Sequence, residues 1–349
     1  MPMYTERGTE MNSYERVMAA FHHVEPDRVP IIENSISDTI VHAFGCKNLY
    51  EFQAQNYDGI TVRIAYRPIS DDGVFYKDEW GITFKRTKET TGHSYYHPIE
   101  DPEDFEKLVL PDPYDPYRFN YLEQAVKEYK GKKAIIFSTR AMFLWAVELC
   151  GMENLMVYIA TEPEFVEAMM DKIVDNQILI ARRALEMGAD MVLETDDYAF
   201  NSGPLISPAA FSKIFAPRLK RYTDAVHDAG GFMVKHSDGN LRQILPAIVE
   251  TGIDAYQSVD PIAGMDLAEC KAQYGDRLVL WGNLDCGDLL SRGTRDDVRN
   301  AVIQCLHDAG PGGGYIMSTS NAIPSDANPD NVRAMIEFTK ELGSYPIRW

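Results

Sequence analysis

The residues around position 236 could carry out chemistry. His236 and Asp238 are separated by one residue, so at the end of an extended strand both side chains point to the same side. A neutral imidazole can bind a metal ion, and a histidine can also act as a general acid or base near neutral pH. A buried histidine that bonds to neighbouring backbone is the alternative, but a place at a predicted strand end favours a functional role.

Further acidic and polar residues follow other apolar runs of the sequence. Glu194 and Asp197 follow one such run, and we predict that they are catalytic together with His236 and Asp238. Acids packed closely together need a proton, an arginine or a metal ion among them. A single acid after a strand is commonly a helix cap, as Asp285 could be. The residues predicted to bind substrate are Glu33, Asn34, Arg140, Asp196, Tyr198, Trp281, Asn283, Asp285, Ser320 and Asn321.

The elements that must position these residues follow a repeating pattern. Short apolar runs alternate with longer segments of helical periodicity, as expected for parallel strands covered on both faces. The eight runs are residues 29–34, 60–65, 134–139, 191–195, 232–235, 255–259, 278–282 and 315–318. This pattern predicts an α/β fold, a (β/α)8 TIM barrel, with a doubly wound open sheet as the alternative. In a barrel, residues that follow the C-terminal strand ends share one rim.

Two segments fall outside the repeated units. Residues 14–22 predict an N-terminal helix, and residues 71–98 predict an inserted β-hairpin with glycines at its turns. An insertion after the second strand lies at the active-site rim, where it could cover a substrate or serve only as a surface elaboration. We therefore expect a single domain over residues 1–349 with one insertion.

The composition limits the partners. A formal net charge of −19 repels phosphate backbones and anionic lipid, so we expect neither nucleic acid nor a membrane as a partner. No apolar run reaches the roughly 18 residues of a membrane span, and the first residues lack the apolar core of a signal peptide. The five cysteines form no C-x-x-C pair. Reduced thiols in the cytoplasm are the expectation.

Seven segments spread over the chain carry a further signal. They are residues 14–17 (YERV), 25–30 (EPDRVP), 236–240 (HSDGN), 281–285 (WGNLD), 312–316 (GGGYI), 322–324 (AIP) and 328–332 (NPDNV). In this order they resemble the uroporphyrinogen decarboxylase superfamily over nearly the whole chain. The resemblance implies a TIM barrel and one of two activities. One is cofactor-free decarboxylation of uroporphyrinogen, and the other is methyl transfer involving a corrinoid carried by a partner protein.

The chain departs from the decarboxylase branch near its first predicted strand. The resemblance implies an arginine-rich segment there, which grips the carboxylates of the substrate. In this chain residues 30–37 contain no arginine and one acid, Glu33. We expect this acid to repel a poly-anionic porphyrinogen, which arginines would bind through paired hydrogen bonds.

The chain also departs from the methyltransferase branch, which binds zinc through H-x-C and a later cysteine. Here Asp238 replaces the first cysteine, and Ser320 or Asn321 stands where the last would be. A zinc-bound thiolate substrate is therefore disfavoured. The remaining metal site is one of nitrogen and oxygen donors from His236, Asp238 and Glu194, which is harder than a thiolate site and less specific for zinc.

Three functions remain open after this comparison. The favoured one is a methyltransferase that moves a methyl group between a small O- or N-methylated compound and a corrinoid-binding protein. Its cofactors would be a divalent metal such as zinc and the corrinoid of the partner. The sequence does not decide whether the protein forms a homodimer. The alternatives are a decarboxylase-like carboxy-lyase without a cofactor, and a non-catalytic barrel that binds a tetrapyrrole or a corrinoid protein.

Overall fold

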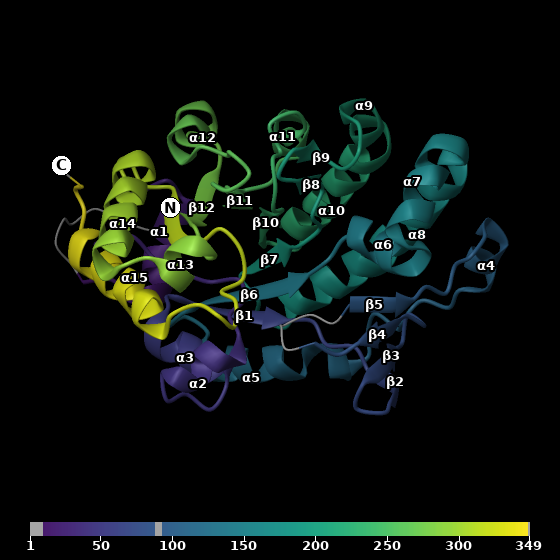
Figure 1. Cartoon of the computed structure of the whole chain (residues 1–349), viewed down its shortest axis with the longest axis horizontal. Helices are drawn as coiled ribbons and strands as arrows, with labels where there is room; N and C mark the ends of the chain where they lie inside the picture. The colour runs from purple at the N-terminus through teal and green to yellow at the C-terminus, as the bar shows by residue number, and fades with distance from the viewer. Residues whose placement is uncertain (1–9, 88–92, 348–349) are drawn as a thin grey trace.

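A parallel sheet of seven strands forms the centre of the molecule and curls so that helices lie outside it (Figure 1). The computed structural model describes residues 10–87 and 93–347. The strands, in their order across the sheet, are β1 (Gly59–Arg63), β6 (Ala134–Thr139), β7 (Met191–Glu194), β10 (Phe232–His236), β11 (Ala255–Ser258), β12 (Val279–Leu284) and β13 (Tyr315–Thr319). The chain has an α/β fold consistent with a TIM-like barrel.

The segment predicted as the first strand, residues 29–34, differs from the prediction. It forms no regular strand, and an isolated parallel bridge pairs Ile31 with Met317 of β13. Pro30 has no N–H to donate, and the Ile31 N–H donates to the Asp58 carboxylate at 2.9 Å instead of a strand carbonyl. On the β1 side, the Asp58 N–H donates to the Ile31 carbonyl at 2.8 Å. The prediction of eight regular strands was therefore wrong: the described residues form seven strands in this sheet. The segment of residues 29–34 fills the gap between β13 and β1.

Helices surround the sheet, and most begin at residues that cap them. Asn12 and Thr294 each form a capping box, in which the cap side chain and the third helical residue bond to each other's backbone. The helices are α1 (Ser13–Phe21), α2 (Asp38–Ala43), α3 (Leu49–Asn56), α4 (Pro102–Lys107), α5 (Asn120–Tyr129), α6 (Phe143–Cys150), α7 (Met152–Thr161), α8 (Pro163–Glu186), α9 (Pro208–Ala210), α10 (Ala216–Asp228), α11 (Leu245–Val249), α12 (Leu267–Tyr274), α13 (Asp288–Arg292), α14 (Arg295–Ala309) and α15 (Pro329–Leu342).

Helix α1 closes one end of the curled sheet. Its residues Val17 and Phe21 belong to one apolar cluster with inward-facing strand residues such as Ile136 and Trp281. The alternate strand residues belong to a second cluster, between the sheet and the outer helices. Because α1 and the inner cluster fill the N-terminal end, the C-terminal ends of the strands are left to form a site.

A separate antiparallel sheet follows β1, at the place where the sequence predicts an inserted hairpin. It has four strands, β2 (Pro68–Asp71), β3 (Phe75–Asp78), β4 (Thr83–Lys85) and β5 (His93–Tyr96), in sequential order. Trp80, in the turn between β3 and β4, stacks on Trp145 of α6 with ring centroids 4.3 Å apart. This stacking fixes the insertion against the rim of the curled sheet.

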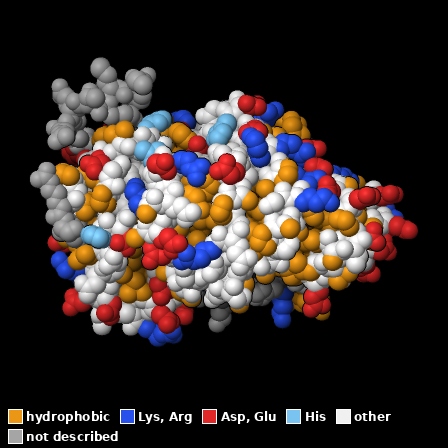
Figure 2. Space-filling view, turned by 90° about the horizontal axis from the view of Figure 1, so that it is seen from above, with side chains coloured by type: hydrophobic (Ala, Val, Ile, Leu, Met, Phe, Trp, Pro, Cys, Tyr) orange, Lys and Arg blue, Asp and Glu red, His pale blue; other side chains and the backbone are white. Residues whose placement is uncertain are grey.

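The surface carries charges of both signs. Figure 2 shows acidic and basic side chains interspersed with apolar ones over most of the face that it presents. Within residues 10–87 and 93–347, no single helix is long and apolar enough to cross a membrane; only α6 and α7 pass such a test together, and they are bent by 107°.

Candidate active site

A cavity of about 620 Å³ opens at the C-terminal ends of the strands, within the size range of small-molecule sites. The ends of the neighbouring strands β1, β6, β7 and β10 form one wall, and the inserted sheet with α6 forms another. The lining residues are Asn34, Ser35, Arg63, Ile64, Tyr66, Pro68, Tyr76, Asp78, Phe84, Arg86, Ser138, Thr139, Arg140, Leu144, Trp145, Glu148, Thr195, Asp197, His236, Asp238, Asn321 and Ala322.

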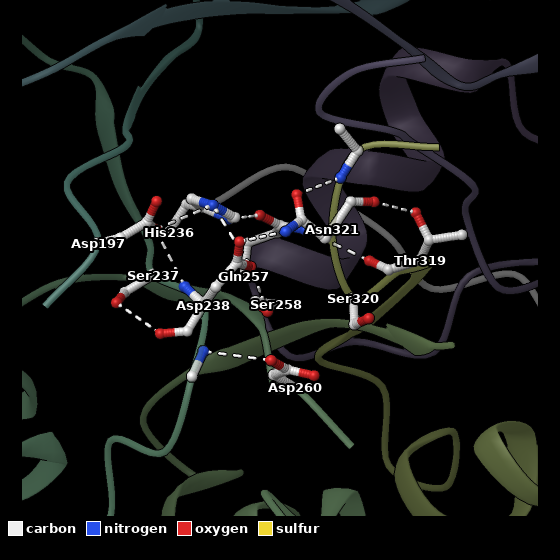
Figure 3. Close-up of polar contacts among 12 residues, drawn as sticks. Asp197, His236, Ser237, Asp238, Gln257, Ser258, Asp260, Thr319, Ser320 and Asn321 are labelled. Atoms are coloured by element: carbon white, nitrogen blue, oxygen red, sulfur yellow. Dashed lines mark hydrogen bonds and ion pairs between the residues drawn. The ribbon is translucent and has the colours of Figure 1, made fainter. Parts of the chain in front are cut away.

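His236 lies between two carboxylates at this cavity. It ends β10, while Asp238 follows two residues later and Asp197 follows β7. The His236 Nε2 is 3.4 Å from an oxygen of Asp197 and 3.6 Å from an oxygen of Asp238. The Asp238 N–H donates to Asp197 at 3.1 Å, so the two loops are tied together. The structure thus brings three of the four predicted catalytic residues together, as Figure 3 shows.

A neighbouring amide fixes how the imidazole presents its nitrogens. The His236 Nδ1 bonds to the side-chain oxygen of Gln257, on the next strand, β11. The Gln257 amide nitrogen in turn donates to the Thr319 carbonyl at 3.4 Å, which supports this orientation of the amide. An acceptor at Nδ1 requires the proton there, so Nε2 is left to face the carboxylates. A lone pair and two carboxylates that face one another need a proton or a cation between them.

Hydrogen bonds and burial set the charge state of Asp238. Ser258 donates to one carboxylate oxygen at 3.0 Å, and the Asn321 amide bonds to the other. Burial raises the pKa of Asp238 and the nearby Asp197 adds to this effect, whereas His236 and the Ser258 bond lower the pKa; the net result is a pKa of about 6. Near neutral pH this acid can therefore either hold or release a proton.

The same three residues fit a divalent metal ion. One donor atom from each of Asp197, His236 and Asp238 lies within 4.8 Å of the others. Two donors bound to one tetrahedral ion through bonds of about 2.1 Å lie roughly 3.4 Å apart, close to the separations from Nε2 given above. The donor set has one nitrogen and two carboxylate oxygens, which suits zinc or a harder divalent ion. On such an ion the protein donors would occupy three positions and would leave room for a substrate.

Glu194, predicted to be catalytic and a metal ligand, lies elsewhere. Its carboxylate is fully buried and pairs with the Lys235 ammonium at 2.6 Å. The N–H groups of Ala141 and Asp196 donate to its other oxygen at 3.2 and 2.9 Å. Side chains alternate along a strand, and Glu194 shares the outward face of Val192, not the inward face that leads to the cavity. Its predicted place in the cluster is wrong, and Asp197 takes it.

Several residues predicted to bind substrate are turned into the protein. Asp196 accepts bonds from the N–H groups of Met142, Phe143 and Leu144, where α6 begins. Asp285 accepts bonds from the N–H groups of Gly287 and Leu289 in the turn into α13. Both acids thus serve helix starts, the alternative expected for an isolated acid. The other residues of this set that lie outside the cavity are Glu33, Tyr198, Trp281, Asn283 and Ser320.

The buried positions of these five residues have identifiable partners or packing. Glu33 accepts bonds from Ser318 and Thr319, so the acid expected to repel a porphyrinogen does not face the cavity. Burial raises the pKa of Glu33 to about 7, against these hydrogen bonds. Trp281 donates to the Ile32 carbonyl at 2.9 Å inside the barrel. The remaining three are Tyr198, packed on Phe143 and Phe211, Asn283, bonded to Val259, and Ser320, buried beside Cys286.

Asn34, Arg140 and Asn321 do line the cavity, as predicted. Arg140 forms an ion pair with Glu148 of α6 at 2.6 Å. Sequence reasoning missed Arg63, which ends β1 and lines the same cavity. The rule that selects residues at strand ends would have found it, had the strand been predicted to end at residue 63 and not 65.

Comparisons with known proteins identify relatives over most of the chain. The family model for uroporphyrinogen decarboxylase (URO-D) matches residues 75–342. A uroporphyrinogen decarboxylase of Chlorobium chlorochromatii is 29% identical over 269 residues, covering 72% of this chain and 73% of the relative. A methylated-thiol–coenzyme M methyltransferase of Methanosarcina mazei is 25% identical over 256 residues, covering 72% of this chain and 64% of the relative.

One solved structure is similar over nearly its whole length. It is a methyltransferase from Methanosarcina mazei with a TM-score of 0.78 and 20% identity, and the match covers 95% of this chain and 99% of the other. At this identity the likeness shows a shared fold and leaves the reaction to be argued from the site.

Proposed function

Because the chain belongs to the uroporphyrinogen decarboxylase family, we propose that it transfers a methyl group between a small methylated compound and a corrinoid-binding protein. The observation that carries the proposal is the cluster of His236, Asp197 and Asp238 at the cavity, in which Nε2 faces two carboxylates. A decarboxylase without a cofactor would not need the metal ion that this set of donors could hold. The absence of arginine from residues 30–37 also disfavours uroporphyrinogen as substrate.

The reaction needs help at the leaving atom. As the bond from oxygen or nitrogen to the methyl carbon breaks, the electron pair stays on the leaving atom, and the carbon bonds to the reduced cobalt of the partner's corrinoid. An alkoxide, phenoxide or amine leaves more readily when it receives a proton. His236 and Asp238 face the cavity and can supply it, and Gln257 holds the imidazole in the required orientation.

A divalent metal held by His236, Asp197 and Asp238 would supply Lewis acidity for the same leaving atom. Glu194, which is committed to Lys235, is no longer proposed as a ligand. The reaction would take place in the cytoplasm, where the free, buried cysteines remain reduced.

The test supplies the protein with free cob(I)alamin and a panel of small O- and N-methylated compounds. We expect loss of the cob(I)alamin absorbance and formation of methylcobalamin with at least one donor, and a much slower reaction after chelation if the metal takes part. A donor-free reaction and the His236→Ala variant are the controls. Carbon dioxide release from a carboxylated compound without cobalamin, and no methyl transfer from any donor, would contradict the proposal.

Decarboxylation of a substrate less anionic than uroporphyrinogen is the second candidate. It is favoured by the 29% identity to a relative named uroporphyrinogen decarboxylase, and by arginines in the cavity that could hold a carboxylate. The two candidates differ in one measurable requirement. Methyl transfer depends on the corrinoid, whereas decarboxylation proceeds without it.

A further inference from the structure

Arg63 is a cation in the cavity that forms no ion pair with any residue the structure describes. It is exposed at the end of β1, whereas Arg140 pairs with Glu148 at 2.6 Å and Arg86 pairs with Asp71. Within the described ranges, 10–87 and 93–347, no ion pair or hydrogen bond of the Arg63 guanidinium is present. Along β1, Arg63 shares the face of Gly59 and Thr61, opposite to that of Ile60 and Val62, which pack on the outer helices. Its side chain is therefore on the inner side, at the barrel mouth.

The groups around Arg63 leave the local charge positive. Its backbone is in register with Ser138 of β6, two residues before Arg140, and the positive charge of Arg140 repels that of Arg63. Glu148 is engaged by Arg140. Burial raises the pKa of Asp78 to about 7, so this acid supplies only part of a negative charge at neutral pH. The guanidinium groups of Arg63 and Arg140 face one cavity in a chain whose net charge is −19, an arrangement that an anion would stabilise.

The walls beside these arginines are aromatic. Tyr66 and Trp145 meet edge to face with centroids 5.2 Å apart, and Tyr76 stacks on Phe84 at 5.1 Å. All four line the cavity. An aromatic or other apolar body fits between such walls better than a strongly hydrated one. The side-chain oxygen of Asn34, also in the lining, is buried without a hydrogen-bond partner and could accept a bond from a ligand.

We propose that Arg63, with Arg140 beside it, binds a carboxylate of the substrate, so that the substrate is a small compound with one anionic end and an apolar body. Guanidinium groups bind carboxylates through two parallel hydrogen bonds. The strands β1 and β10 are three places apart in the sheet, or roughly 14 Å along its curved wall. Since Arg63 and His236 both reach inward, one aromatic ring with substituents at opposite ends would span the two. Which end reacts rests on the proposed function, but the binding of the anion does not.

The experiment compares two probes of equal shape, 4-methoxybenzoate and 4-methoxybenzamide, by titration calorimetry with the full chain. We expect wild-type protein to bind the benzoate at least about tenfold more tightly, because hydrogen bonds to charged groups are worth ten- to a hundredfold in affinity. Arg63→Gln should remove this preference, and Arg63→Lys should keep part of it. Arg86→Gln is the matched control at the same cavity, and it should keep the preference.

Three results would overturn the anion site: equal affinity of wild type for the two probes, no binding of the benzoate, or an unchanged preference in Arg63→Gln protein of native melting temperature. Failure of the proposed function gives a different pattern. In that case the benzoate preference and its loss in Arg63→Gln are seen, while no methyl group reaches cob(I)alamin. His236→Ala serves as the second reference, because it should lose methyl transfer and retain the preference for the benzoate.

Discussion

Lys235 and His236 are neighbours at the end of β10, yet their side chains lie in two opposite electrostatic environments. The Lys235 ammonium has three donors, and it uses them on the carbonyls of Asp196 and His236 and on the carboxylate of Glu194, each at 2.6 Å. Its ammonium also lies 4.5 Å from the centre of the Tyr198 ring. Every strong donor of this side chain is thus satisfied by the protein.

The His236 side chain, one residue later, differs because only one of its two ring nitrogens is held by a neutral protein partner. One nitrogen is held by Gln257, and the other faces the carboxylates of Asp197 and Asp238 across the cavity wall. Among residues 10–87 and 93–347, no lysine or arginine forms an ion pair with either of these acids, whereas Lys235 forms one with Glu194. The difference teaches that buried charge alone does not mark a functional site. The informative feature is a polar group whose partners leave one position open toward a cavity.

The largest expected effect comes from removing the imidazole. His236→Ala should lower the rate of methyl transfer by two to four powers of ten, the range for loss of a general acid or base, and should weaken zinc binding. The melting temperature should change little, because the side chain lies at a cavity rim and leaves no large core void. Cobalamin spectroscopy, metal analysis and thermal unfolding measure the three quantities.

The matched control is His307→Ala, which removes an exposed histidine that also contacts a carboxylate, that of Asp308. Its rate and metal content should equal those of the wild type. Full activity of His236→Ala with an authentic substrate would contradict the contrast drawn between Lys235 and His236, because the side chain that faces the cavity would then have no part in the reaction.

The second-largest expected effect comes from breaking the buried ion pair of Lys235 and Glu194. Lys235→Met should lower the free energy of unfolding by about 3–5 kcal/mol, because it leaves the Glu194 carboxylate buried without its counter-charge. Adding Glu194→Gln should recover much of this loss, and urea unfolding of both variants measures it. A loss below about 1 kcal/mol from Lys235→Met, together with loss of activity, would instead assign the pair to the reaction.

Glu33 lies between these two extremes, since it accepts hydrogen bonds but forms no ion pair within the part of the chain that the structure describes. Burial raises its pKa from the ordinary 4.5 of a glutamate to about 7. The folded protein therefore binds this proton more tightly than the unfolded chain does, and the resulting stability is full below pH 4.5 and declines as the pH rises through 7.

Glu33→Gln removes this titration. The stability of the variant relative to wild type should therefore rise between pH 5 and 8, by up to about 3 kcal/mol. Unfolding in urea at a series of pH values measures the difference. Parallel stability profiles for the two proteins would show that Glu33 is ionised in the folded state and is satisfied by its three donors alone.

Much of the fold was accessible from the sequence, because buried parallel strands appear as short, nearly continuous apolar runs. The first run failed because Pro30 and the side chain of Asp58 alter the hydrogen bonding locally. Periodicity does not report such a long-range bond. The inserted sheet has more strands than the predicted hairpin because short strands, such as the three residues of β4, leave little periodic signal.

The site was predicted in part for a related reason. The rule of strand ends selected His236, Asp197 and Asp238 correctly as neighbours, since strands β7 and β10 pair directly. It also selected Glu194, although alternation places this residue on the same face as Val192, away from the inner cluster. Which acids become helix caps, as Asp196 does, depends on the position of a loop from another strand. The position of that loop depends on the tertiary structure, and no local sequence pattern predicts it.

The smallest effect tests that last point. Asp285→Ala should cost only about 1 kcal/mol, the usual loss when a carboxylate stops accepting backbone N–H bonds at a helix start. Its partners are the Gly287 and Leu289 N–H groups at 2.7 and 3.3 Å, and it does not line the cavity. The matched control is Asp266→Ala. The Asp266 carboxylate caps α12 by accepting a hydrogen bond from the Glu269 N–H at 2.8 Å. Both variants should unfold at slightly lower urea concentration with unchanged methyl transfer. If Asp285→Ala slowed the reaction while the equally destabilised Asp266→Ala did not, the Asp285 carboxylate would have a functional role although both its oxygens accept backbone hydrogen bonds. The presence of protein partners would then no longer distinguish structural charged groups from reactive ones.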